Sequence, residues 1–152
     1  MVTVATDLWD VVASVVDPEI PVLTIEDLGV LRDVTEESGT VRVTITPTYS
    51  GCPAMRQIED EITSALLRAG VEDFEIIVVH NPPWTTDWIS AEGHRKLSAF
   101  GIAPPSSPHD ILCPRCQAHD PRLVARFSGT ACQALLVCSS CGEPFKQFKV
   151  LR

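Results

Sequence analysis

The chain has 152 residues, 45% of them hydrophobic, which is enough for one folded core and a small appended module. It contains no run of 18 or more apolar residues and does not start with a basic segment ahead of a long apolar core, which excludes a membrane span and a signal peptide. Residues 1–104 carry 6 basic and 17 acidic residues, a net charge of −11 that argues against a nucleic-acid-binding face there, whereas residues 105–152 carry 6 basic and 3 acidic residues.

These properties predict a soluble cytoplasmic protein. Disulfides are disfavoured in that compartment, so the 6 cysteines need another explanation. All of them except Cys52 fall within the last forty residues of the chain. This clustering favours a metal site near the C-terminus.

The first elements follow from periodicity and proline. Apolar residues at helical spacing predict an amphipathic helix over about residues 5–16. The helix ends before Asp17-Pro18, because a residue that precedes proline is disfavoured in the α conformation. A shaped loop then ends in a short strand over about residues 29–35. The acidic side chains of this loop either solvate it or face a functional surface.

The middle of the chain alternates between strand and helix patterns. A turn is predicted over residues 36–39, and the alternating residues 41–46 predict a half-buried strand. A helix is predicted to start at Cys52-Pro53 and to run to about residue 69, where a glycine ends it. The near-continuous apolar run over residues 74–79 predicts a third strand that is central in the sheet and covered on both faces.

Cys52 lies in the tight loop between the second strand and this helix. The following Pro53 suits a first helical turn, where its missing N–H costs no hydrogen bond. Cys52 is therefore predicted at the helix start, where unpaired N–H groups and the helix dipole favour a thiolate. Such a thiolate can act as a nucleophile or as a metal ligand. The alternative is that Cys52 is only a small buried residue in a strand–helix corner.

A stiff aromatic loop over residues 80–88 follows the third strand, and a helix is predicted over about residues 90–100. Trp84 and Trp88 either pack as lids at the sheet edge or anchor a partner protein. His80 is a candidate ligand near Cys52, since both lie at the ends of adjacent elements. The alternative is that His80 has a structural role.

Prolines and serines near residue 105 predict a stiff linker. We therefore expect a main domain over residues 1–103, a linker over residues 104–110 and a small module over residues 111–152. No internal repeat or low-complexity segment is apparent in the sequence.

The small module carries two Cys-x-x-Cys pairs, which are typical of a zinc ribbon. Each pair directs two sulfurs at one ion, and the two pairs complete a tetrahedron made of Cys113, Cys116, Cys138 and Cys141. A module of this size cannot bury a sufficient core, so we expect the metal to supply folding energy. Four sulfurs close the coordination shell, which predicts a structural zinc, with rubredoxin-like iron as the alternative. Cys132 is expected in the ribbon core, outside the ligand set.

The predicted strands of the ribbon span about residues 123–127, 134–137 and 145–150. A nucleic-acid-binding ribbon is a weaker alternative, because its basic residues are opposed by the acidic main domain. These residues are Arg115, Arg122, Arg126, Lys146 and Lys149.

Several stretches of the main domain together resemble the SufT-type iron–sulfur assembly domain. They are Asp17-Pro18-Glu19-Ile20-Pro21, Asp27-Leu28-Gly29, Thr46-Pro47-Thr48-Tyr49-Ser50-Gly51-Cys52-Pro53 and Pro82-Pro83-Trp84-Thr85-Thr86-Asp87-Trp88. With the ribbon, and with its stretches over residues 127–135 and 143–148, nearly the full chain resembles the PaaD family, also called PaaJ, of the phenylacetyl-CoA epoxidase system. The chain departs from that family at Val150, where members often carry a further cysteine, so we expect no additional ligand there.

The resemblance implies an α/β (α+β) fold, in which helices pack against a small mixed sheet and a C-terminal zinc-ribbon β module follows. It also implies a role in aerobic phenylacetate breakdown. There, a multicomponent oxygenase epoxidises the ring of phenylacetyl-CoA, using a di-iron oxygenase subunit and a reductase with flavin and an iron–sulfur cluster. On this basis the protein is a non-catalytic accessory factor that matures one of these metal centres, and the reductase cluster is the favoured client.

The single reactive cysteine of the family corresponds to Cys52, which would bind iron or a cluster transiently. Trp84 and Trp88 would meet the client. Because clusters usually need four ligands, one cysteine requires ligation shared with the client or across a homodimer.

Two further functions stay open at the level of the sequence. The protein could be a non-catalytic docking subunit of the oxygenase complex, which the ribbon and the aromatic loop favour. It could also be a thiol enzyme that uses Cys52, for which His80 is the candidate base. The sequence offers no Gly-rich nucleotide loop and no Glu-x-x-His di-iron motif for other chemistry.

Overall fold

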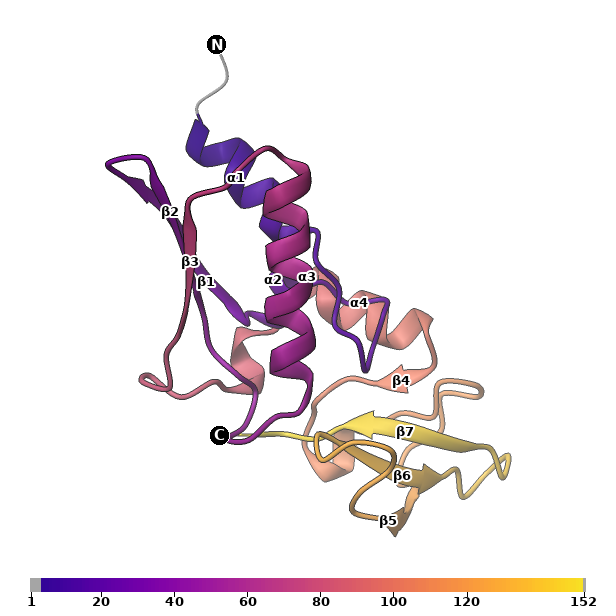
Figure 1. Cartoon of the computed structure of the whole chain (residues 1–152). Coiled ribbons are helices and arrows are strands. Elements are labelled where there is room, and N and C mark those ends of the chain that lie inside the picture. The colour runs from indigo at the N-terminus through magenta and orange to yellow at the C-terminus, as the bar shows by residue number, and fades with distance from the viewer. Residues whose placement is uncertain (1–3, 152) are drawn as a thin grey trace. The chain divides into compact units, whose positions relative to one another are not determined.

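The computed structural model describes the backbone of residues 4–151 and the side chains of residues 7–151. The chain forms two compact units, residues 1–84 and residues 85–152, and each has its own sheet (Figure 1). The mixed α/β architecture confirms the predicted fold class. The domain boundaries expected from the sequence, which assign residues 85–103 to the main domain, stay a prediction. Residues 1–3 and 152, which those domains include, lie outside the described residues.

The first unit combines a three-stranded mixed sheet with helices. Strands β1 and β2 form an antiparallel hairpin, and β3 lies parallel to β2 on its other side. The connection from β2 to β3 is the long helix α3, as a parallel pair requires. The elements in chain order are α1 (Val4–Ala13), α2 (Ile25–Leu28), β1 (Leu31–Glu37), β2 (Thr40–Ile45), α3 (Ala54–Arg68) and β3 (Phe74–Val78).

The core of this unit lies between the sheet and the helices α1 and α3, which contact each other (Figure 1). On β2 the alternating side chains of Val41, Val43 and Ile45 are buried, while Arg42 is exposed. On α3 the buried residues recur with helical spacing, as an amphipathic helix requires; they are Ala54, Met55, Ile58, Ile62, Ala65 and Leu66. The sequence therefore predicted both elements within two residues of their ends.

The predicted central position of the third strand is wrong. β3 has β2 as its one neighbour among the described strands, so β2 is central and β3 is an edge strand. No β3 side chain is fully buried, and Val78 is exposed. An apolar run can reflect β propensity alone, because β-branched side chains suit an extended backbone even where one face of the sheet is not covered.

The loop before β1 is more ordered than its prolines predicted. The Thr24 hydroxyl accepts a hydrogen bond from the Asp27 N–H, and the Asp27 carboxylate accepts one from the Thr24 N–H, each at 3.0 Å. This reciprocal capping starts the one-turn helix α2, which Gly29 ends in a left-handed conformation with φ of 75°. The pattern Thr-x-x-Asp was the sequence signal for this helix.

Asp17 neither solvates its loop nor faces a surface. Its side chain is buried, and its Oδ1 accepts hydrogen bonds from the N–H groups of Glu19 at 2.6 Å and Ile20 at 2.9 Å. Burial raises the pKa of Asp17, and these two hydrogen bonds oppose that shift. The acidic residue thus fixes the turn through Pro18.

The second unit builds a four-stranded sheet in the order β4-β7-β6-β5. β7 pairs antiparallel with β6 and parallel with the short β4, and β6 pairs antiparallel with β5. The β4 strand was not expected, because two residues after a helix carry no periodic signal. The elements in chain order are η1 (Thr86–Trp88), α4 (Ala91–Ala99), β4 (Ile102–Ala103), η2 (Pro108–Asp110), β5 (Arg122–Ala125), β6 (Gln133–Val137) and β7 (Pro144–Phe148).

None of the helices in the described part of the chain is long and apolar enough to cross a membrane.

Two neighbouring leucines test the packing of α3. Leu66 is 0% exposed and Leu67 is 52% exposed. Leu66→Ala should lower the free energy of unfolding by about 2–5 kcal/mol, because it leaves a cavity in the core. Leu67→Ala, the matched control, should change it by less than about 0.5 kcal/mol. Urea unfolding followed by circular dichroism measures both, and equal effects would contradict the packing described for α3.

The raised pKa of Asp17 predicts a pH-dependent stability. Because the folded state binds this proton more tightly than the unfolded state, the contribution of Asp17 is most favourable below its ordinary pKa of 3.8 and is lost as the pH rises through the folded pKa. Asp17→Asn keeps an acceptor oxygen and does not titrate. Relative to wild type, the free energy of unfolding of Asp17→Asn should therefore increase as the pH rises from 3.8 through the folded pKa of Asp17. Urea unfolding at several pH values measures this difference. Asp10→Asn, at an exposed position of α1, is the charge control. A difference between Asp17→Asn and wild type that does not change with pH would contradict the pKa shift.

Candidate functional site

Cys52 lies in a tight turn between β2 and α3, as the sequence predicted. The Cys52 N–H donates to the Tyr49 carbonyl at 3.3 Å, and the Cys52 carbonyl accepts from the Met55 N–H at 3.3 Å. Gly51 has a φ of 78°, a left-handed conformation that disfavours other residues. The turn leaves the Cys52 side chain half-buried, so its sulfur is neither a core atom nor fully exposed.

Cys52 stands directly before the start of α3. Cys52 precedes Pro53, which is the N-cap of α3, so the helix begins one residue later than expected. The first turn of α3 has neither a side-chain cap nor an acidic residue. No acidic side chain in that turn therefore opposes the positive end of the helix dipole. The hydroxyl of Thr48 lies 4.0 Å from the Cys52 sulfur, within the range of a weak hydrogen bond to sulfur. Thr48 was not singled out from the sequence, although it stands in the same short stretch.

Two backbone carbonyls on either side of Gly29 accept hydrogen bonds from distant parts of the first unit. The Val30 carbonyl accepts a hydrogen bond from the Thr46 N–H at 2.9 Å. The Leu28 carbonyl accepts one from the Trp84 indole Nε1–H at 2.8 Å. Three sequence stretches that are far apart in the chain thus meet around Gly29, and one of them leads directly into the Cys52 turn.

Trp84 was expected as a candidate for a partner surface, and the structure corrects this expectation. Its side chain is 4% exposed, and its N–H group is used inside the unit. A buried indole that satisfies a backbone carbonyl is a packing residue, in agreement with the alternative of a lid. Trp88 is half-buried, so it keeps a surface that a partner can contact.

His80 is exposed after β3. Within the described residues, no hydrogen bond joins the His80 ring to Cys52. Neither His80 nor Cys52 belongs to a cluster of potential metal ligands in that part of the chain. The structure therefore does not assemble the nucleophile–base pair that a thiol enzyme needs.

The four cysteines of the ribbon converge on one point. Their sulfurs all lie within 4.8 Å of one another, with 3.7 Å between Cys113 and Cys141 and 3.5 Å between Cys116 and Cys138. A tetrahedron of sulfurs around zinc, with bonds of about 2.3 Å, has edges of about 3.8 Å, so the spacing fits a metal ion. These distances are far longer than the roughly 2.05 Å of a disulfide bond.

Two of the ribbon thiols have pKa values that their neighbours shift in opposite directions. Hydrogen bonds from the N–H groups of Cys141 and Ser140 lower the pKa of Cys138 to about 6. The pKa of Cys141 rises to about 12, because desolvation and the sulfurs of Cys116 and Cys138 outweigh a hydrogen bond from the Glu143 N–H that lowers it. Neighbouring thiols thus compete for ionisation, and a bound cation removes that competition.

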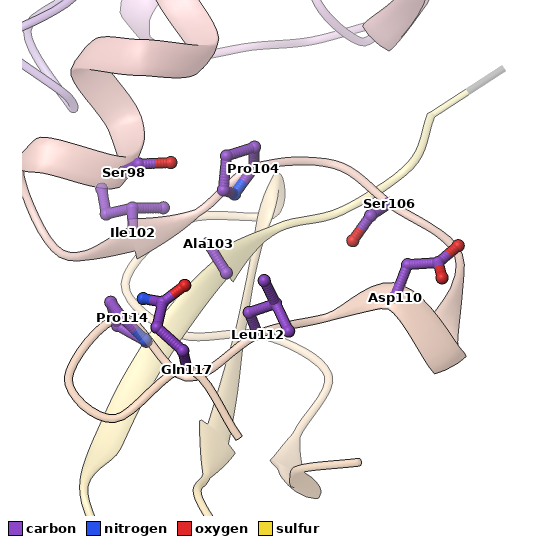
Figure 2. Close-up of a pocket in the computed structure, with 9 residues that line it drawn as sticks. All are labelled: Ser98, Ile102, Ala103, Pro104, Ser106, Asp110, Leu112, Pro114 and Gln117. Carbon is purple, nitrogen blue, oxygen red and sulfur yellow. The ribbon is translucent and has the colours of Figure 1, made fainter. Parts of the chain in front are cut away.

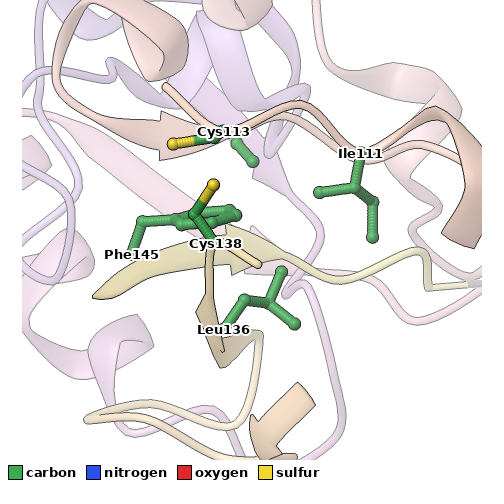
Figure 3. Packing of buried hydrophobic residues seen from close by; sticks show 6 residues of the cluster. Ile111, Cys113, Leu136, Cys138 and Phe145 are labelled. Carbon is green, nitrogen blue, oxygen red and sulfur yellow. The ribbon is translucent and has the colours of Figure 1, made fainter. Parts of the chain in front are cut away.

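Two of these four cysteines are also core residues of the ribbon. Cys113 and Cys138 are buried in a cluster with Ile111, Leu136 and Phe145, and Figure 3 shows both beside the Phe145 ring. Cys116 and Cys141 are exposed. A bound ion would therefore join the small hydrophobic core to the surface loops that carry the exposed sulfurs.

Cys132 is buried, as expected, and is not part of the four-sulfur group. Its sulfur lies 3.0 Å from the Thr130 hydroxyl. It behaves as a small core residue at the start of β6.

A cavity of about 300 Å³ lies in the second unit beside the first cysteine pair (Figure 2). Its lining is mainly apolar, with Ile102, Leu112 and Pro114 among the lining residues, and Asp110 and Gln117 stand at opposite sides of it. Neither Cys52 nor a sulfur of the metal site lines this cavity.

Family models cover most of the chain. Residues 5–76 match the model described as iron–sulfur cluster assembly protein, and residues 102–149 match the PaaD zinc beta ribbon domain.

Among curated proteins, the chain is 39% identical over 152 residues to a protein of Escherichia coli K12 that is named as a subunit of the "Putative 1,2-phenylacetyl-CoA epoxidase", in an alignment that covers 95% of this chain and 92% of that protein. It is also 44% identical over 79 residues to the Fe-S protein maturation auxiliary factor YitW of Bacillus subtilis, covering 51% of this chain and 76% of the relative. A similar factor, SufT of Staphylococcus aureus, is 36% identical over 78 residues, covering 50% of this chain and 88% of the relative.

Solved structures support the fold. A crystal structure of a DUF59 domain of unknown function from Bacillus anthracis superposes with a TM-score of 0.57 at 32% identity, covering 61% of this chain and 90% of that one. A conserved hypothetical protein from Thermotoga maritima superposes with a TM-score of 0.52 at 28% identity, covering 63% and 94% of the two chains.

Removing a ribbon ligand tests the metal site in the full chain. Cys138→Ser should lower bound metal from about one ion per chain to well below that value and unfold the ribbon, because three thiolates hold the ion less tightly than four and the metal supplies folding energy. Cys132→Ser, which changes a buried cysteine outside the group, should keep the metal. Elemental analysis of purified protein measures both. Equal metal content in the two variants would contradict the assignment of Cys138.

Proposed function

This chain belongs to the PaaD family, which joins an iron–sulfur cluster assembly domain to a zinc β-ribbon, and from that premise we propose that it is an accessory protein that matures an iron–sulfur centre of the phenylacetyl-CoA epoxidase. The relative that matches over 95% of this chain carries the epoxidase in its name, and two shorter relatives carry Fe–S protein maturation in theirs. The two descriptions together support an accessory role in phenylacetate catabolism.

The observation that carries the proposal is the placement of Cys52 within the assembly domain. A half-buried thiol stands at the uncapped start of a 15-residue helix, with a threonine hydroxyl beside its sulfur. The thiolate form of a cysteine is the form that binds iron. The sulfur remains accessible enough to receive its cargo and to release it.

The chemistry proposed for Cys52 is ligand exchange. The Cys52 thiolate donates an electron pair to an iron atom of the cargo, and a client thiolate then displaces it at the same iron. No electron is transferred, and each iron–sulfur bond that breaks at Cys52 is replaced by one at the client. A single cysteine leaves the other coordination positions to the client or to a second copy of this chain, so cargo held by Cys52 alone is readily passed on.

For the ribbon we propose a structural zinc held by Cys113, Cys116, Cys138 and Cys141. The set of four sulfurs matches the usual composition of structural zinc sites, and it leaves no open position for a substrate. The ribbon then serves as a folded module for contacts with other proteins.

The favoured client is the iron–sulfur cluster of the epoxidase reductase. Trp88 is the aromatic residue of the loop after β3 that keeps a partly exposed surface for this contact. In this proposal the protein itself catalyses no reaction on an organic substrate.

The maturation role is tested in cells that express the epoxidase components. Replacing wild type by Cys52→Ser should lower the iron and sulfide bound to the reductase roughly tenfold or more, because a serine hydroxyl is a poorer iron ligand than a thiolate. Analysis of iron and labile sulfide in the purified reductase, with its visible spectrum, measures this. Ser50→Ala, in the same exposed turn, is the matched control and should leave the reductase loaded.

Full loading of the reductase by Cys52→Ser would remove the maturation role. If epoxidation still required the chain, and the chain co-purified with the oxygenase at fixed stoichiometry, the protein would instead be a non-catalytic docking subunit.

A further inference from the structure

We propose that the outer edge of the ribbon sheet is a docking surface for an extended acidic segment of another epoxidase component. This surface, the β5 edge patch, consists of Leu123, Val124 and Phe127 together with Arg122 and Arg126. The choice of an epoxidase component as partner rests on the proposed function, whereas the chemistry of the patch does not.

The apolar side chains of the patch are unusually exposed. Leu123 is 50% exposed, Val124 is 46% exposed and Phe127 is 67% exposed, and the three lie within five consecutive residues. Single exposed apolar residues are normal on a protein surface, whereas several in one short segment flanked by exposed arginines mark a candidate interaction site. Phe100, which is 56% exposed in the same unit, lies outside this group.

The backbone of β5 also offers a place for a partner. In the described sheet β5 pairs with β6 alone, so it is an edge strand, and Figure 1 shows it on the outside of β6. An edge strand presents a row of N–H and C=O groups that an extended segment can pair with. Pairing of this kind brings the partner's side chains next to Leu123 and Val124.

The charge around the patch is basic. Arg122 and Arg126 are exposed, and within the described part of the chain neither forms an ion pair. The Lys149 ammonium lies 4.1 Å from the centre of the Phe127 ring and donates to the Arg126 carbonyl at 2.9 Å. One ammonium thus lies over the exposed Phe127 ring, and two exposed arginines stand in the same segment, which together favour a partner with acidic side chains next to apolar ones.

A second copy of this chain is a poorer occupant. An antiparallel pair of two β5 strands centred on Val124 would place Arg122 of one copy opposite Arg126 of the other, just past the end of β5. Like charges at neighbouring cross-strand positions are destabilising. The same arginines therefore disfavour pairing between identical copies and favour an acidic partner.

The test measures binding of the full chain to the purified reductase and, separately, to the purified oxygenase component. Wild type should bind one of them, with an affinity that falls as salt is raised. Phe127→Glu should weaken binding about tenfold or more, because it places a carboxylate in the centre of the patch. Arg126→Glu should mainly slow association and reduce the salt dependence. Phe100→Glu is the matched control and should bind as wild type does.

Metal content equal to that of wild type shows that each variant is folded. The proposal is overturned if neither component binds at micromolar concentration or if Phe127→Glu binds like wild type. It is also overturned if Phe127→Glu instead dissociates a homodimer, or if hydrogen exchange in the isolated chain protects those β5 amides that are not bonded to β6, since the outer edge would then already be covered. Cys52→Ser should bind normally, so failure of cluster maturation and failure of docking give different results.

Discussion

The hydrogen bonds accepted by two carbonyls, those of Leu28 and Val30, hold together the part of the molecule that carries Cys52. One carbonyl accepts the indole N–H of Trp84, and the other accepts the N–H of Thr46. Gly29 lies between them in a left-handed conformation that ends α2. Because an unpaired buried polar group is costly, each of these contacts fixes a segment that has little regular structure of its own.

The two units are stabilised in different ways. The first buries a hydrophobic core between α3, α1 and a three-stranded sheet, and Cys52 is not part of that core. The second has a small core cluster that includes two of its cysteines, so a bound ion and hydrophobic packing stabilise the same residues. The thiol proposed to exchange cargo and the thiols proposed to hold a permanent ion therefore belong to separate units.

Local patterns in the sequence predicted most of this structure, and long-range contacts account for what they missed. The helical spacing of Ile58, Ile62 and Leu66 placed α3, and the two Cys-x-x-Cys pairs identified the four sulfurs that converge. The edge position of β3 depends on how many strands join the sheet, which an apolar run does not encode. The burial of Trp84 depends on a carbonyl 56 residues earlier in the chain, so no local pattern distinguishes it from the half-buried Trp88.

Because the four ribbon sulfurs differ in exposure, a bound ion would be attacked from the side of the two exposed sulfurs. Each Cys-x-x-Cys pair has one buried member, Cys113 or Cys138, and one exposed member, Cys116 or Cys141. A chelator or an oxidant approaching from solvent meets the exposed sulfurs first, while the buried pair stays anchored beside Phe145. Loss of the ion would then pass through a two-coordinate state in which the hydrophobic core of the ribbon is still packed, and the ribbon would unfold only when the last two sulfurs release the ion.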